Sequence, residues 1–369
     1  MLIGVPKEIK NLENRVALTP SGAKTLVQAG HKVRIETNAG TGAGFSNQEY
    51  SDSGAEIVDS AGAWDCDLVL KVKEPQAKEF AFLKDNILFT YLHLAGVDPA
   101  LTEALLQAGT TAIAYETVED AHGRYPLLAP MSAIAGNMAT LVGCYYLARP
   151  NGGKGIQAAS IQDRRYGKIM IIGDGVVGKH SALTADGIGA NVFLFGRSDK
   201  KLKEWGKTRP NSIHFVLSNE TNISEHIRDT DLLIGAVLVS GSKAPHLVSE
   251  NMVRQMQPGS VIVDVSIDQG GCIETSHPTT HSDPVYIKHD VTHYCVSNMP
   301  GAYPRTATLA LTHETLPYAI RLASEGISSL NKDPGFAIGV NTCKGYITNK
   351  PVAESQDNMK MFKDISSLV

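Results

Sequence analysis

The chain has 369 residues, enough for two domains of ordinary size that each have their own hydrophobic core. It is 43% hydrophobic and has a formal charge of −4 without basic blocks, which excludes an electrostatic reason for binding nucleic acid or an anionic membrane. It has no apolar stretch of about 18 residues, and its five cysteines are scattered without a C-x-x-C pair. We therefore expect a cytoplasmic protein that binds small molecules.

Strand-like and helix-like segments alternate from the first residues onward, which is typical of parallel sheets covered by helices. Near the N-terminus, Thr19-Pro20 predicts the start of a helix and Gly30 its end, and Asp98-Pro99 and Gly109 predict another helix in the same way. The strands predicted around these helices cover residues 2–5, 33–36, 68–73, 87–92 and 111–115.

A second series of strands is predicted at residues 168–172, 192–195, 213–217, 232–237 and 261–265. Residues 131–148 are mostly apolar and predict a long linking helix, and residues 306–323 predict a helix that returns to the first domain. The expected fold class is α/β, with two doubly wound, Rossmann-like parallel sheets separated by a cleft. The predicted domains are a discontinuous substrate domain, 1–128 plus 306–369, and a dinucleotide-binding domain, 129–305.

A glycine-rich turn follows the apolar strand at residues 168–172. The sequence Gly173-Asp174-Gly175-Val176-Val177-Gly178 places a G-x-G-x-x-G pattern between a strand and a helix, the setting in which it binds a dinucleotide. The helix N-terminus would offer N–H groups to the phosphates. The next strand ends at Gly196, where such folds usually place an acid that binds the adenosine ribose.

Several side chains at predicted strand ends suit proton transfer or carbonyl binding. His93 follows strand 87–92, and an imidazole there could donate or accept a proton, although a lone histidine more often has a structural role. Lys73 and Lys71 would share one face of strand 68–73, and Lys73 either binds a substrate oxygen or is a solvated strand end. Asp268 is either a cofactor contact or a turn former, and Ser132 either caps the linking helix or binds a phosphate.

Four histidines, His277, His281, His289 and His293, show the i, i+4 spacing of helical metal ligands. Pro278 and Pro284 would break such a helix, so we expect no metal site there.

Ordered strings along nearly the whole chain resemble the bacterial L-alanine dehydrogenase family, which is related to the pyridine nucleotide transhydrogenases. They are Gly4-Val5-Pro6-Lys7-Glu8, the Arg15 segment, Val72-Lys73-Glu74-Pro75, Leu92-His93-Leu94, Ala129-Pro130-Met131-Ser132, Gly235-Ala236-Val237-Leu238-Val239, Ile267-Asp268-Gln269-Gly270-Gly271 and Ser297-Asn298-Met299-Pro300.

The resemblance implies reversible oxidative deamination of L-alanine to pyruvate and ammonium, with NAD as hydride acceptor, in a homohexamer. It assigns substrate binding to Arg15 and Lys73, acid/base catalysis to His93, and proton handling near the nicotinamide to Asp268. Together with the fingerprint, it implies these cofactor contacts: Ser132, Gly173, Gly175, Val176, Val177, Gly178, Gly196, Arg197, Lys201, Ser218, Val237, Leu238, Val265, Ser266, Ile267, Asp268, Val296, Ser297, Asn298 and Met299.

Three positions depart from the family. Gly196, followed by Arg197 and Ser198, replaces the acid that binds the ribose hydroxyls of NAD, so NADP is a competing cofactor. His277 replaces an arginine, and the loop at residues 158–165 has lost its usual glycines.

Three other functions remain open on the sequence. The first is the nucleotide-binding subunit of a transhydrogenase, which would need no amino-acid site. The second is another amino-acid dehydrogenase of related architecture, such as a saccharopine dehydrogenase. The third is a catalytically silent nucleotide sensor, suggested by Gly196 alone.

Overall fold

The computed structural model describes residues 1–207, 212–237 and 244–369. The chain divides into two compact units, Met1–Met131 with Tyr303–Val369, and Ser132–Ala302. Each unit has its own sheet, and most strands in both sheets pair in parallel with helices between them. The predicted α/β class with two doubly wound sheets is therefore confirmed.

The first unit contains an eight-stranded sheet with the order β17-β16-β6-β5-β4-β1-β2-β3. The pairs from β6 to β3 are parallel, whereas β16 and β17 join antiparallel at one edge. The strands are β1 (Leu2–Val5), β2 (Lys32–Glu36), β3 (Glu56–Val58), β4 (Leu68–Leu70), β5 (Ile87–Thr90), β6 (Thr111–Ala114), β16 (Val340–Cys343) and β17 (Tyr346–Ile347).

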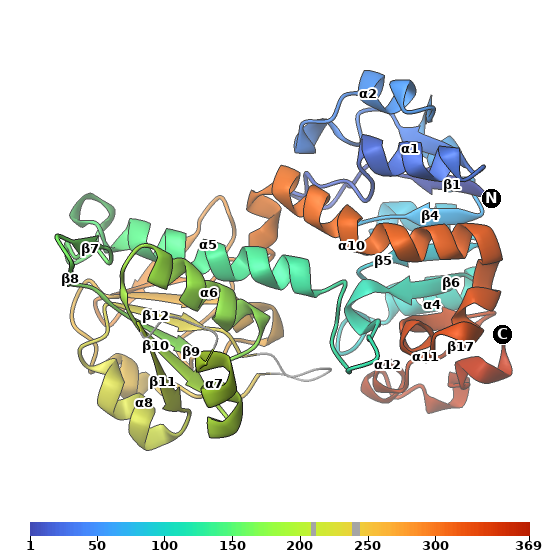
Figure 1. Ribbon diagram of the computed structural model, residues 1–369. Helices are drawn as coiled ribbons and strands as arrows, with labels where there is room; N and C mark the ends of the chain where they lie inside the picture. Colours follow the sequence, from blue (N-terminus) through green and yellow to red (C-terminus); the bar gives the residue numbers. More distant parts are fainter. Residues whose placement is uncertain (208–211, 238–243) are drawn as a thin grey trace. The chain divides into compact units, whose positions relative to one another are not determined.

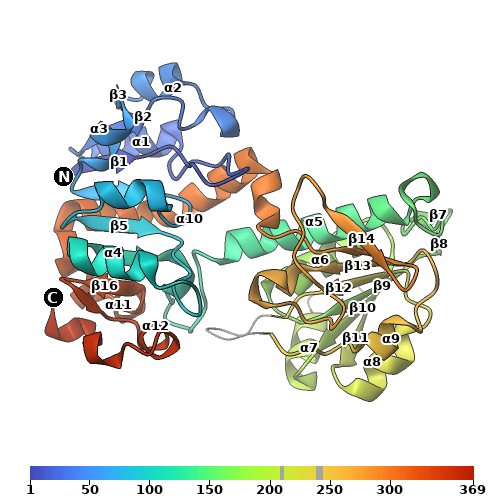
Figure 2. The same ribbon diagram turned by 180° about the vertical axis from the view of Figure 1, so that it is seen from behind.

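Helices cover both faces of this first sheet. Helix α10 lies across one face and α4 across the other (Figures 1 and 2). The Thr19 side chain caps α1 as predicted, accepting a hydrogen bond from the Gly22 N–H. The helices are α1 (Pro20–Gln28), α2 (Asn47–Asp52), α3 (Ser60–Trp64), α4 (Ala100–Ala108), α10 (Pro304–Glu325), α11 (Pro334–Ile338) and α12 (Lys350–Ser355).

Helix α10 is fixed to the N-terminal segment of the same unit. The Thr308 hydroxyl accepts a hydrogen bond from the Val16 N–H, and the Thr312 hydroxyl donates to the Ala17 carbonyl. Leu311 and Ala319 are buried on the same helix. The helix is therefore held by both apolar packing and polar contacts to the loop that follows β1.

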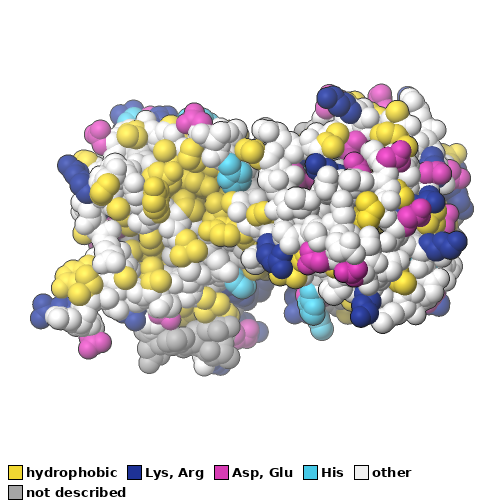
Figure 3. All heavy atoms as spheres, turned by 90° about the horizontal axis from the view of Figure 1, so that it is seen from above, with side chains coloured by type: hydrophobic (Ala, Val, Ile, Leu, Met, Phe, Trp, Pro, Cys, Tyr) yellow, Lys and Arg dark blue, Asp and Glu magenta, His cyan; other side chains and the backbone are white. Residues whose placement is uncertain are grey.

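Helix α5 (Ala129–Leu147) begins in the first unit and continues in the second. Its Met138 and Ala139 side chains belong to the core of the second unit, but Leu141 and Tyr145 are 49% and 59% exposed. Hydrophobic side chains gather on the face of this unit drawn in Figure 3. No helix in the described part of the chain is both long and apolar enough to cross a membrane.

The second unit contains a seven-stranded sheet with the order β11-β10-β9-β12-β13-β15-β14. Only β14 is antiparallel, so the six parallel strands follow the order 3-2-1-4-5-6 of dinucleotide-binding folds. The strands are β9 (Lys168–Ile172), β10 (Asn191–Gly196), β11 (Ile213–Leu217), β12 (Leu232–Gly235), β13 (Val261–Asp264), β14 (Val285–Lys288) and β15 (Val291–Tyr294).

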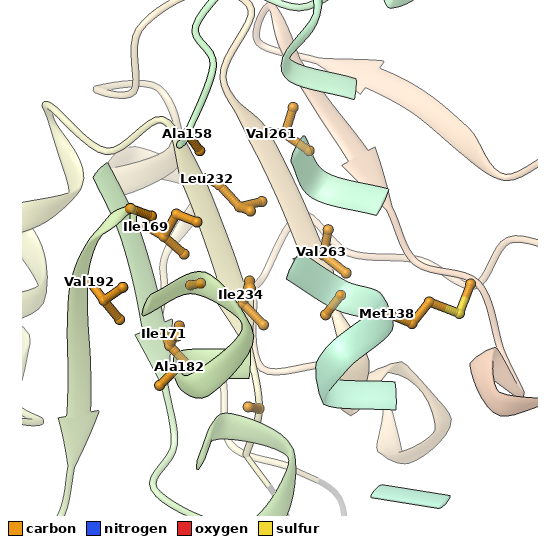
Figure 4. Close-up of a cluster of buried hydrophobic side chains, with 14 of the residues drawn as sticks. Met138, Ala158, Ile169, Ile171, Ala182, Val192, Leu232, Ile234, Val261 and Val263 are labelled. Atoms are coloured by element: carbon orange, nitrogen blue, oxygen red, sulfur yellow. The ribbon is translucent and has the colours of Figure 1, made fainter. Parts of the chain in front are cut away.

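Alternate residues of these strands form two separate cores. Ile169 and Ile171 of β9 point to the face covered by α5 and α6 (Val176–Gly187), as Figure 4 shows with Ala182. Met170 and Ile172 point to the opposite face, covered by α8 (Glu220–Ile227) and α9 (Glu250–Val253). Continuous apolar strands are required because both faces of a parallel sheet are buried. Helix α7 (Asp199–Gly206) follows β10.

Candidate functional site

The predicted substrate residues follow strands at the switch point of the first sheet. From β1 the sheet continues to β2 and β3 on one side, and from the neighbouring β4 to β5 and β6 on the other. Ligands bind at the carboxyl ends of strands where the order reverses in this way. Arg15 follows β1, Lys73 follows β4 and His93 follows β5, so the structure gathers these three at one edge of the first unit.

Arg15 is almost fully buried and paired with Glu13. The Arg15 Nε donates to Glu13 Oε1 at 2.6 Å, its Nη2 binds Glu13 Oε2, and its Nη1 lies 3.2 Å from Met131 Sδ. Burial alone would lower the pKa of Arg15, but the hydrogen bond and charge of Glu13 outweigh it and raise that pKa. The guanidinium is therefore permanently charged and fixed in one plane.

Lys73 lies beyond β4, which ends at Leu70, so the prediction that Lys71 and Lys73 share a strand face is wrong. Lys73 is half-buried, and its Nζ lies 5.9 Å from the centre of the Tyr91 ring. No carboxylate within the described ranges forms an ion pair with it. Burial lowers the pKa of Lys73, and the nearby charge of Arg15 lowers it further. The Lys73 ammonium can therefore donate to the oxygen of a ligand.

Lys71 has a different environment from Lys73 because its ammonium is fully buried between two carboxylates. Lys71 Nζ lies 3.1 Å from Glu8 Oε2 and 3.0 Å from Glu79 Oε1. Glu8 Oε1 also accepts the backbone N–H groups of Val72 at 2.7 Å and Lys73 at 3.3 Å. The buried ion pairs thus fix the backbone from which Lys73 extends.

His93 lies three residues past the end of β5 and has a left-handed backbone, with φ of 49°. The Glu116 carboxylate accepts the His93 N–H at 2.6 Å and the Leu92 N–H at 3.2 Å, and Glu116 Oε1 lies 3.8 Å from His93 Nδ1. The imidazole stacks parallel to the Tyr91 ring, and the Tyr91 hydroxyl donates to the Leu127 carbonyl at 2.6 Å. The ring itself is half exposed, so a solvent-borne ligand can reach it.

The glycine-rich turn of the second unit has the geometry that a dinucleotide requires. Gly173 has φ of 117°, and a Cβ there would lie 2.2 Å from the Ala236 carbonyl oxygen. A Cβ on Gly178 would lie 1.8 Å from the Gly173 oxygen, whereas a Cβ on Gly175 would meet nothing within 4 Å. Space is thus kept only where a pyrophosphate would approach.

The first N–H groups of α6 complete this turn. Gly175 is the N-cap of α6 and provides no side-chain hydrogen bond, and Val176 is 40% exposed. Uncapped N–H groups at a helix N-terminus attract an anion. The turn therefore fits the phosphates of a nicotinamide dinucleotide.

The end of β10 lies beside this turn. Gly196 is buried at the last position of the strand, and its carbonyl accepts the Ser218 N–H at 2.8 Å. Arg197 and Lys201 are exposed, and the Ser198 hydroxyl caps α7 by accepting the Lys201 N–H at 3.4 Å. The predicted ribose region is therefore compact and has two exposed cations.

A buried acid organises the turn that contains Asp268. Asp264 ends β13, and its carboxylate accepts the N–H groups of Ser266 and Cys272 at 3.0 Å each. Ser266 Oγ in turn accepts the Val237 N–H at 2.9 Å. Burial raises the pKa of Asp264, and these hydrogen bonds lower it in part. Asp268 itself is exposed within the short 3-10 helix Val265–Gln269.

The remaining cofactor candidates also lie in the second unit. Ser132 is in the first turns of α5, which begins at Ala129, so its predicted role as the helix cap is wrong. Val296 to Met299 follow β15, and Asn298 has φ of 59°. Leu238 lies outside the described residues.

The histidine-rich segment contains strands β14 and β15 and no helix, and of its four histidines only His293 lies in a strand. His293 is buried and lies 2.8 Å from the Thr275 hydroxyl, and burial lowers its pKa to about 4. His289 pairs with Glu250, and His277 stacks on Tyr286. Within residues 1–207, 212–237 and 244–369, no three His, Cys, Asp or Glu side chains gather as metal ligands.

Sequence reasoning missed the residues that support the candidates. Glu13, Tyr91, Glu116 and Asp264 each hold or contact a predicted functional residue. Glu13 and Tyr91 lie two positions from Arg15 and His93, so local spacing could have drawn attention to them. Glu116 is remote from His93 in the sequence, and only the parallel pairing of β5 with β6 brings them together.

Comparison with known proteins matches nearly the whole chain. Residues 4–135 match the alanine dehydrogenase/PNT N-terminal domain, and residues 139–350 match the alanine dehydrogenase/PNT C-terminal domain. The chain is 51% identical over 358 residues to alanine dehydrogenase of Bacillus subtilis (strain 168), covering 96% of this chain and 94% of that protein. It is 48% identical over 359 residues to alanine dehydrogenase 2 of Staphylococcus aureus (strain USA300), covering 96% of each.

Two solved structures also match. An L-alanine dehydrogenase has a TM-score of 0.93 and 47% identity, covering 97% of this chain and 100% of its own. A transhydrogenase from Sinorhizobium meliloti has a TM-score of 0.83 at 24% identity, covering 94% and 100%, and shows a common fold.

Proposed function

Because this chain belongs to the alanine dehydrogenase/PNT family, we propose that it reversibly converts L-alanine, water and NAD⁺ to pyruvate, ammonium, NADH and a proton. One observation carries the proposal: Arg15, Lys73 and His93 gather at the switch point of one sheet, while the other sheet presents a dinucleotide turn. The identity to alanine dehydrogenases across almost the entire chain supports the same reaction. A transhydrogenase subunit would need no amino-acid site.

Arg15 would bind the substrate carboxylate and Lys73 its carbonyl oxygen or carboxylate. Glu13 holds the guanidinium plane in place before substrate arrives, so little side-chain entropy is lost on binding. Lys73 forms no ion pair with a carboxylate of the described residues, so its ammonium can donate to a substrate oxygen. The two cations together favour a small 2-oxo or 2-amino acid.

His93 and Asp268 would move the protons of the reaction. His93 would take the hydroxyl proton of the carbinolamine as the carbonyl forms, and return it in the reverse direction. Asp268 would act on the water or amine proton. When bound, NAD accepts the hydride from the substrate carbon. The Val237 to Ser266 hydrogen bond and the Asp264 contacts would keep the Asp268 turn in position beside it.

NAD is the proposed cofactor, and NADP is the competitor suggested by Gly196 and Arg197. The Ser198 hydroxyl accepts a helix-capping hydrogen bond from the Lys201 N–H, and its own O–H remains a donor that a 2′-phosphate could use. A homohexamer and a cytoplasmic location also remain proposals. The exposed Leu141 and Tyr145 on α5 support self-association, and light scattering after gel filtration would measure it.

The first experiment is to follow absorbance of the reduced nicotinamide with L-alanine and either NAD or NADP. We expect turnover with NAD that requires L-alanine. Replacing His93 by asparagine should abolish turnover while cofactor binding persists, because asparagine tolerates the left-handed backbone but transfers no proton. His122→Ala, at an exposed turn, is the matched control. Cofactor binding without turnover on any amino acid would favour the silent sensor instead.

A further inference from the structure

The second strand of the dinucleotide fold ends without the acid that usually binds the adenosine ribose. Gly196 occupies that position and has no side chain. The fold normally needs a carboxylate there to accept hydrogen bonds from the ribose hydroxyls and to repel a 2′-phosphate. The question is whether another residue supplies one.

The Asp174 carboxyl group occupies the space next to Gly196. A Cβ built on Gly196 would lie 2.9 Å from both Cγ and Oδ2 of Asp174, and 2.7 Å from Leu202 Cδ2. Asp174 comes from the glycine-rich turn after β9, and β9 and β10 are paired in register up to Ile172 and Phe195. The two strand ends are therefore neighbours, and a carboxyl group from one occupies the side-chain position of the other.

The Asp174 carboxylate is placed to receive a ligand. It is half-buried, and within residues 1–207, 212–237 and 244–369 it forms no ion pair and no side-chain hydrogen bond. A partly desolvated carboxylate gains most from hydrogen-bond donors that a ligand brings.

We propose that Asp174 provides the ribose-binding carboxylate in place of residue 196 and sets the preference for NAD over NADP. The proposal rests on the dinucleotide-binding function proposed above. The acid stands at the second position of the glycine-rich turn and not at the end of β10, but its carboxyl group lies next to the position that the usual acid would occupy. Gly196 leaves this space to Asp174, because a side chain there would collide with Asp174 and Leu202 unless both side chains shifted.

Binding of NADH and NADPH, followed by their fluorescence, tests this directly and does not depend on turnover. The wild type should bind NADH at least about tenfold more tightly than NADPH. Asp174→Ala should weaken NADH binding by about ten- to hundredfold, the range for a hydrogen bond to a charged group, and should strengthen NADPH binding. Asp199→Ala, which removes an exposed acid at the start of α7, should leave both affinities unchanged.

A double variant makes the test specific to position. Gly196→Asp alone should bind NADH poorly because of the collision, whereas Asp174→Ala with Gly196→Asp should recover NADH binding. An unchanged NADH to NADPH ratio in folded Asp174→Ala would overturn the Asp174 proposal alone. If the folded wild type bound neither nucleotide, the proposed function would fail as well.

Discussion

Replacing Glu116 by glutamine should disable His93 without touching a substrate-binding group. Glu116 accepts two backbone N–H groups, from Leu92 and His93, and glutamine keeps only one uncharged acceptor oxygen. The loss of one charge-assisted hydrogen bond costs about 1.5–3 kcal/mol. The left-handed backbone of His93 costs ~1–2 kcal/mol by itself, so the weakened loop should leave that conformation.

If all of this energy serves to position His93, kcat should fall by about ten- to hundredfold, since ~1.4 kcal/mol is a factor of ten. The KM for L-alanine should change little because Arg15 and Lys73 are not altered, and NADH should bind normally. Steady-state kinetics and NADH fluorescence measure these quantities, with Glu103→Gln on the surface of α4 as the control. Wild-type kcat in a folded Glu116→Gln variant would refute the positioning role.

Two further predictions concern the lysines after β4. Because burial and the nearby Arg15 charge lower the pKa of Lys73, its ammonium should lose its proton below the ordinary value of ~10.4. The affinity of the NADH complex for pyruvate should therefore begin to fall at a lower pH than it would if an exposed lysine bound the pyruvate. Lys73→Arg should remove this loss of affinity at high pH. If the loss were unchanged in that variant, a group other than Lys73 would be responsible for it. Lys71→Met should lower the free energy of unfolding by ~3–5 kcal/mol in urea titrations, because two buried carboxylates lose their cation. The loss of stability should be smaller at acid pH, because burial raises the pKa of Glu8 and a protonated Glu8 no longer needs a cation. Lys84→Met, which removes an exposed ion pair, is the control and should have little effect. An equal loss of stability in both variants would contradict the reasoning.

Much of the fold could be predicted because its elements have local causes. Strands β1, β9 and β11 begin and end where the apolar runs do, and the Thr19 cap fixes the start of α1. Strands β3 and β14 to β17 were missed because each has only two to four residues and most of them mix polar with apolar side chains. Strand β4 ends at Leu70 and not at the predicted Lys73, and the Lys71 side chain that follows it forms a buried ion pair with Glu8.

The sequence by itself indicated the family, the dinucleotide turn and the candidates Lys73 and His93, since motifs and strand ends are local features of the chain, and the resemblance to the family added Arg15. Only the tertiary structure decided which groups support them. Glu13 forms an ion pair with Arg15, Glu116 after β6 accepts the backbone N–H of His93 after β5, and Asp174 occupies the space beside Gly196. These relations depend on strand register and on the volume that neighbouring side chains leave. The absence of an acid at Gly196 can therefore be interpreted only because the structure shows that the Asp174 carboxyl group lies in that space.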